Sequence, residues 1–258
     1  MKKKKTLLLL FYIMLSAIAN AQDPHFSQYF ASPLTLNPAM TGYFKGDYRV
    51  AANFRNQWNA LGDPFTTSTI SYDSKILQNK VVENDIFGVG VMALYDKSLN
   101  GGFKNINVSA SVAYHKTIDE AGEDNLAAGF QFTYASRAID IGKLNFASQF
   151  NGSGFDTNLP TNENFVTTRR NYLDINTGIL YTHKTENNEF YIGGSFYHLT
   201  RPNTSFLKNE KFKLPLRFTL HSGGRINIGE NGNELFMSGL LMEQAGSFEK
   251  KLRYCLWL

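Results

Sequence analysis

The sequence predicts an all-β protein, an outer-membrane β-barrel of about nine or ten strands. First, apolar residues alternate with small or polar residues over many short stretches, which is typical of strands with one apolar face. Second, 43% hydrophobic residues, 14% aromatic residues and 21 glycines suit a barrel whose strands each give a weak signal. Third, an export signal precedes these stretches, and no later stretch is apolar for long enough to form a transmembrane helix.

Residues 1–21 have the three parts of a secretory signal peptide. Residues 2–5 are all lysine, and residues 6–18 form an apolar region that is too short for a stable transmembrane helix. The small-x-small site at 19–21 predicts cleavage before Gln22. We therefore expect a cleaved, exported chain that is located in the outer membrane.

The signal peptide also carries the excess of positive charge. The chain has 26 Lys+Arg and 22 Asp+Glu, and removal of the four lysines at 2–5 leaves 22 of each. The mature chain is formally neutral, so its global charge gives no reason to expect a nucleic-acid partner. The one cysteine, Cys255, excludes an intrachain disulfide.

Residues 22–45 fit neither a strand nor an amphipathic helix, because they mix polar and aromatic residues without a clear period. We expect them to form a plug inside the barrel or a periplasmic lead-in. The β-barrel domain is then expected to occupy residues 46–258.

The strands are expected in chain order after this segment. The clearest alternation lies at 48–58, 87–95, 106–114, 126–134, 173–181 and 216–220. Weaker runs lie at 65–73, 189–198 and 234–241, and a tenth strand is expected at 250–258.

The two faces of these strands differ in a way that favours a membrane barrel. The apolar face often ends in a tyrosine, as an aromatic girdle requires. These tyrosines are Tyr72, Tyr95, Tyr114, Tyr134 and Tyr181. The other face is rich in Gly, Ser, Asn and Thr, which suits a wet lumen. A soluble β-sandwich or barrel with a tyrosine-rich rim is the alternative that alternation alone leaves open.

The expected connections are asymmetric in length. Those at 182–188 and 222–233 are fairly short, whereas those at 135–172 and 199–215 are long. Short periplasmic turns and long outer loops are typical of outer-membrane barrels. If the mature N-terminus is periplasmic, these lengths partly support that topology, whereas the connections at 74–85 and 115–125 are longer than it expects.

No catalytic, cofactor-binding or metal-binding residues are predicted. The five histidines, His25, His115, His183, His198 and His221, lack the spacing of a zinc motif. Ser153 and Ser222 lie outside a nucleophile motif, so a membrane hydrolase is only a minor hypothesis. Several glycines are expected to mark bends or close backbone approach: Gly88, Gly90, Gly193, Gly194, Gly223 and Gly224.

Three arginines are candidate lumen charges: Arg49, Arg55 and Arg217. Arginine on a lumen face needs carboxylates or carbonyl oxygens as partners. Arg49 and Arg55 either clamp the 22–45 segment or line a path for an anionic group, and clamping is the favoured interpretation.

Three runs near the start of the mature chain form a distinctive set of motifs. They are DPHFSQYF at 23–30, LNPA with a following glycine at 36–42, and FRNQW at 54–58. The motif residues are Pro24, Phe26, Gln28, Tyr29, Asn37, Pro38, Ala39, Gly42, Arg55, Gln57 and Trp58. This set resembles the PorP/SprF family of outer-membrane proteins in the type IX secretion and gliding system of Bacteroidota. Weaker similarities extend the resemblance to about residues 22–245.

The resemblance implies a β-barrel related to FadL-like transporters, with the Asn-Pro-Ala segment near a lumen plug. It implies no catalysis and no cofactor. It implies a role in the secretion or surface retention of partner proteins with type IX C-terminal signals, such as gliding adhesins. Other type IX components and outer-membrane lipid are then the expected neighbours. A FadL-like channel for hydrophobic small molecules is the alternative function.

The C-terminus departs from the family pattern that this resemblance implies. Family members usually continue for several more strands, whereas this chain stops at Leu258. An open sheet edge in lipid is not viable. A truncated reading frame and a shorter member that closes in its own way are both open interpretations, and the resemblance favours truncation.

Overall fold

The structure is a computed structural model that describes residues 23–24, 26–61, 63–77, 85–207, 212–228 and 233–257. The predicted signal peptide at 1–21 and the histidine at position 25 lie outside the described residues.

Ten antiparallel strands form one sheet in which each strand pairs with the next along the chain. They are β1 (Tyr48–Gln57), β2 (Phe65–Ile76), β3 (Ile86–Ser98), β4 (Phe103–Thr117), β5 (Asp124–Ile139), β6 (Arg169–Lys184), β7 (Asn188–Tyr197), β8 (Arg217–Ile228), β9 (Asn233–Gln244) and β10 (Ser247–Trp257). The helical elements are short: η1 (Tyr29–Ala31), α2 (Pro33–Leu36), η2 (Pro38–Met40), η3 (Asn59–Leu61), η4 (Leu99–Gly101), η5 (Ile141–Lys143) and η6 (Ala147–Gln149). The predicted all-β class and strand number are confirmed.

Most strands are longer than the alternation indicated, so the expected connections at 135–172, 182–188 and 222–233 are partly strand. Residues 222–228 continue β8, where Gly223 pairs with Tyr191 and Gly224 with Phe190 of β7. The inward-facing Gly223 leaves room for the Tyr191 ring, since a Cβ there would lie 2.4 Å from the Tyr191 hydroxyl oxygen. The glycines therefore serve close packing inside a strand and do not end it.

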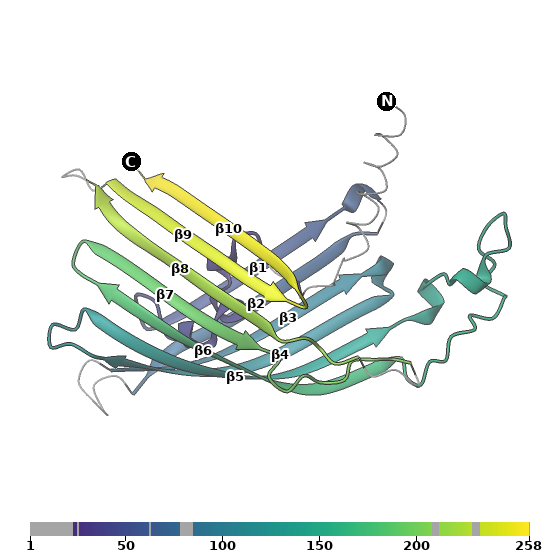
Figure 1. Cartoon of the computed structure of the whole chain (residues 1–258), viewed down its shortest axis with the longest axis horizontal. Helices are drawn as coiled ribbons and strands as arrows, with labels where there is room; N and C mark the ends of the chain where they lie inside the picture. Colours follow the sequence, from purple (N-terminus) through teal and green to yellow (C-terminus); the bar gives the residue numbers. More distant parts are fainter. Residues whose placement is uncertain are drawn as a thin grey trace.

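The sheet curls into a half-barrel with a concave and a convex face (Figure 1). Burial is inverted relative to a soluble protein. Large apolar side chains project from the convex face, such as Phe54 at 71% exposed and Leu173 at 72%. Polar side chains on the concave face are buried, such as Thr67 and Asp73 at 0%. This arrangement is that of an outer-membrane β-barrel and differs from a soluble β-sandwich, which would bury its apolar side chains.

The two ends of the sheet differ in their connections. At the short-connection end, residues 118–123 and 185–187 link neighbouring strands. At the long-connection end, residues 140–168 and 198–216 link β5 to β6 and β7 to β8, and residues 140–168 project away from the sheet (Figure 1). The predicted asymmetry is present in these four connections, whereas residues 99–102 and 245–246 are short connections at the same end as 140–168. Among the described residues, no helix has the length and apolar character needed to cross a membrane.

Residues 23–24 and 26–47, here called the N-terminal segment, lie on the concave face. The segment runs from the long-connection end, where Asp23 contacts His198, to the short-connection end, where it enters β1. Its apolar side chains pack on inward-facing residues of the sheet. This cluster consists of Tyr29, Leu36, Ala39, Met40, Ala127, Leu180, Tyr191 and Leu240.

Candidate functional site

Asn37 anchors the middle of the N-terminal segment to the sheet. Its side chain is fully buried, and its Nδ2 lies 2.9 Å from Ile179 O, 3.3 Å from Gly194 O and 2.9 Å from His221 Nε2. Its Oδ1 accepts a hydrogen bond of 2.8 Å from Ala39 N and so caps η2. Because an amide nitrogen donates, His221 Nε2 acts as acceptor here. One side chain therefore joins the segment to β6, β7 and β8.

A row of small residues lets the backbone of the segment approach the sheet. Cross-strand partners along this row are Gly88, Ala113, Gly129, Gly178, Ser195 and Thr219. A Cβ at Gly178 would lie 2.0 Å from Asn37 Oδ1, and one at Gly129 would lie 2.4 Å from Ala39 N. A Cβ at Gly88 would lie 2.3 Å from Thr41 O. The expectation of close backbone approach holds at Gly88, and the approaching chain is the N-terminal segment.

Arg49 and Asp73 hold the end of the segment that leads into β1. Arg49 lies directly opposite Asp73 across the β1–β2 ladder, and its Nε and Nη2 donate to the two carboxylate oxygens at 2.9 and 2.8 Å. Arg49 also donates to Tyr43 O at 3.1 Å and to Met40 O at 3.0 Å. Asp73 in turn accepts from Gly42 N at 2.9 Å. The pair satisfies backbone groups of a segment that forms no ladder of its own.

We predict that Arg49→Gln lowers the free energy of unfolding by about 3 kcal/mol, because it leaves the buried Asp73 carboxylate without its charge partner. The measurement is urea unfolding of the detergent-solubilised protein, followed by tryptophan fluorescence. The double variant Arg49→Gln/Asp73→Asn should lose less than the two single variants added together. Arg169→Gln, at an exposed position at the start of β6, serves as control. Additive losses would contradict a coupled pair.

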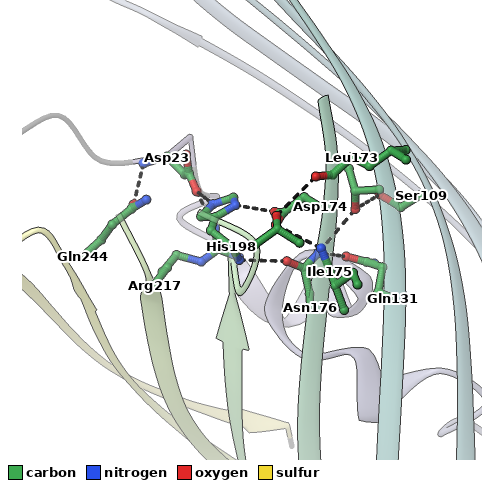
Figure 2. Close-up of polar contacts among 12 residues, drawn as sticks. Asp23, Ser109, Gln131, Leu173, Asp174, Ile175, Asn176, His198, Arg217 and Gln244 are labelled. Carbon is green, nitrogen blue, oxygen red and sulfur yellow. Dashed lines mark hydrogen bonds and ion pairs between the residues drawn. The ribbon is translucent and has the colours of Figure 1, made fainter. Parts of the chain in front are cut away.

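Asp23 lies in a buried cluster of charges at the long-connection end (Figure 2). Its carboxylate contacts His198 Nε2 and lies 3.6 Å from Arg217 Nη1 and 3.9 Å from Arg137 Nη2. The other ring nitrogen of His198, Nδ1, lies 2.5 Å from Asp174 Oδ2. An imidazole with a carboxylate at each nitrogen donates through both when it is protonated.

The environment shifts the pKa of both Asp23 and His198. Burial alone would raise the pKa of Asp23, but the charges of His198, Arg217 and Arg137 outweigh it and lower that pKa. Burial alone would lower the pKa of His198, but the charge of Asp23 and the hydrogen bonds to Asp174 and Asp23 raise it. The cluster therefore favours a charged His198 between two carboxylates.

We predict that this cluster makes stability depend on pH. Because the pKa of His198 is raised on folding, its contribution is complete below the ordinary value of 6.5 and is lost as pH rises through the folded pKa. The urea midpoint should therefore fall between neutral and alkaline pH. His198→Gln should flatten this dependence, whereas Gln28→Ala, at an exposed position without a titratable group, should leave it unchanged. An unaltered profile in His198→Gln would refute the prediction.

The other sequence-predicted residues lie at various places in the fold. Phe26 and Tyr29 are buried, Gln28 is exposed, and Pro38 is buried beside Asn37. Gly42 has a φ of 79°, in the left-handed region that favours glycine. Two further motif residues lie near the end of β1. Gln57 is exposed, and the ring of Trp58 packs edge-on against that of Phe65, with 5.1 Å between the ring centroids.

Two of the candidate lumen charges, Arg49 and Arg217, bind described residues of the N-terminal segment. Arg49 binds Met40 and Tyr43, and Arg217 Nη2 donates to Thr35 O at 3.0 Å. Arg55 lies farther along β1, where its Nη2 is 3.5 Å from Thr67 Oγ1.

Sequence reasoning did not single out Asp73, Asp174 or His198 as partners of this segment, nor Asp23 as the segment's own charged contact. Alternation places Asp174 on the polar face of the predicted strand at 173–181, and it likewise marks Asp73 as inward-facing. Within the described residues, no group of three or more His, Cys, Asp or Glu side chains is arranged to hold a metal ion.

A family model described as type IX secretion system membrane protein PorP/SprF matches residues 18–254. A comparison with curated proteins finds no match.

Proposed function

Because the chain belongs to the PorP/SprF family of type IX secretion system membrane proteins, we propose that it is a non-enzymatic outer-membrane barrel that assists secretion of partner proteins. Its partners would be secreted proteins with type IX C-terminal signals, such as adhesins, together with other type IX components. Retention of these proteins at the cell surface is part of the same proposal.

The inverted burial of the sheet is the observation that carries the outer-membrane location. Convex-face side chains such as Phe130, Phe132 and Ile179 are at least half exposed, and they would face lipid. Residues 1–21 would direct export and be cleaved before Gln22. In this proposal the N-terminal segment acts as a plug, because it is held against the concave face at both ends and in the middle.

A channel for hydrophobic small molecules has weaker support. The concave face carries buried polar side chains such as Asn176, Gln131 and Thr219, which do not suit an apolar ligand. An apolar cavity of about 570 Å³ lies between β6, β7 and β8, and convex-face residues such as Ile179, Ile192 and Phe196 line it. This cavity would therefore face lipid and would not open into the lumen.

The experiment is a deletion of the gene in its host, complemented by the full chain with a C-terminal affinity tag. We expect the tagged chain in the outer-membrane fraction, co-purification of a type IX component, and restored surface display of a secreted adhesin. Mass spectrometry of the mature N-terminus checks cleavage before Gln22. Recovery of the chain as a soluble periplasmic monomer would overturn the location, and normal adhesin display in the deletion strain would overturn the role.

A further inference from the structure

The charged side chains that hold Asp23 belong to the barrel and are positioned independently of Asp23. Arg217 is the first residue of β8, and its guanidinium carbon lies 4.0 Å from the centroid of the Tyr197 ring. Arg137, in β5, lies 5.7 Å from the centroid of the Tyr172 ring. Stacking and strand geometry therefore fix both guanidinium groups before any carboxylate arrives.

These groups form an anion-binding site, here called the cationic site: Arg137, Asp174, His198 and Arg217. Their side chains are between 2% and 16% exposed. Without Asp23, two arginines and a histidine would face the single carboxylate of Asp174. Buried positive charge of this kind is costly unless an anion compensates it. The site therefore requires a carboxylate, and in the structure the N-terminal segment supplies it.

The cationic site also has polar capacity that Asp23 does not use. A cavity of about 50 Å³ adjoins Asp23, and polar side chains such as Asn105 and Asn107 line it. The Oδ1 atoms of both asparagines and Nε of Arg137 are buried without a hydrogen-bond partner among the described residues. Unsatisfied buried polar atoms around free space favour a ligand with more polar atoms than one aspartate side chain.

The part of the segment that carries Asp23 has more exposed residues than the part around Asn37. Ser27 and Gln28 are exposed, and the carbonyl oxygen of Phe26 accepts only a long hydrogen bond of 3.4 Å from Lys251 Nζ. In contrast, Asn37 and Thr41 are both fully buried. Phe26 and Tyr29 are nevertheless buried, and Asp23 N donates to Gln244 Oε1 at 2.8 Å, so a partner must replace these contacts when it displaces this part of the segment.

We propose that the cationic site is a receptor for an acidic, extended peptide of a partner protein, and that Asp23 is its intramolecular occupant. Binding of the partner displaces residues 23–31, while Asn37 keeps the rest of the segment in place. The site lies at the long-connection end, so the partner approaches from that side. This proposal does not depend on the secretion role.

The test uses the mature chain in detergent, with Cys255→Ser and a fluorophore on Gln28→Cys. The probe is a peptide with the sequence of residues 22–31, compared with the same peptide carrying asparagine in place of its aspartate. We expect the acidic peptide to bind and the amide peptide to bind at least about tenfold more weakly, since charge-assisted contacts are lost. Asp23→Asn in the protein should raise the affinity for the acidic peptide about tenfold, because the internal competitor is weakened.

Arg217→Gln should abolish binding, and Arg225→Gln at the short-connection end should leave it unchanged. Arg217→Lys, which keeps the charge, replaces Arg217→Gln if that variant does not fold, and it should bind with reduced affinity. Equal binding of the two peptides, or an unchanged affinity in Asp23→Asn, would overturn the proposal. Light scattering checks whether the Asp23→Asn chain forms a dimer with the wild-type chain. Such a dimer would identify a second copy of this chain as the occupant and would overturn the proposal.

Discussion

Asn37→Ala is expected to lower the free energy of unfolding by about 3 kcal/mol or more, because several buried backbone groups would lose their partner together. The substitution removes the hydrogen bonds to Ile179 O and Gly194 O, and it removes the cap on Ala39 N. It also leaves a cavity at a position that is 0% exposed. Urea unfolding monitored by tryptophan fluorescence measures the loss, and chymotrypsin cleavage after Tyr29 reports release of the segment.

Asn37→Asp separates the two roles of this side chain. It keeps an oxygen that can cap Ala39 N, but it loses the donor and places a charge beside two carbonyl oxygens. It should therefore destabilise the fold at least as much as Asn37→Ala. Gln28→Ala is the matched control, since its side chain is exposed on the same segment. Equal stability of the Asn37→Ala and Gln28→Ala variants would show that the anchor contributes little.

Gly178→Ala is expected to have a comparable effect through a steric clash. Its Cβ would lie 2.0 Å from Asn37 Oδ1, and Asn37 is held by contacts with three strands. Neither the strand nor the anchor can move without breaking hydrogen bonds, so we expect a loss of about 3 kcal/mol. The same unfolding assay measures it, together with the heat-modifiable mobility of the folded barrel on a gel.

Gly194→Ala is the control for this prediction. Gly194 pairs with Ile179, the neighbour of Gly178, and the nearest atom to its Cβ would be Thr219 O at 3.7 Å. The methyl group would meet only ordinary van der Waals contact, so stability should change by less than about 0.5 kcal/mol. Gly178→Ala with wild-type stability would contradict the close docking of the segment.

The relation between Arg49 and Asp73 illustrates how much of the site the sequence could predict. Alternation assigns each residue to a face, and it marks both side chains as inward-facing. It does not say which residues lie opposite each other, because a shift of the β1–β2 register changes every partner. The clamping interpretation of Arg49 named the segment as a partner but had no means to name Asp73.

The glycines of the predicted strands indicated where another group approaches the backbone, but not which group. A glycine on the polar face of a predicted strand indicates that something approaches the backbone closely. At Gly88 that neighbour is Thr41 of the N-terminal segment, and at Gly193 it is His221 of β8 together with Asn37 of the segment. For Gly223 the neighbour is a tyrosine of the adjacent strand, and residues 222–228 of the expected connection at 222–233 are part of β8.

By itself the sequence determined the all-β class, the number of strands, the face of most strand residues and the family. These follow from local properties: a period of two, the spacing of turns and the motifs in residues 23–58. Only the tertiary structure decided what lies on the concave face and what holds it there. His198 and Asp23 are 175 positions apart, and Asn37 and His221 are 184 apart. Such pairs form because the curled sheet brings β5 to β8 around the segment, and no local pattern encodes that curvature.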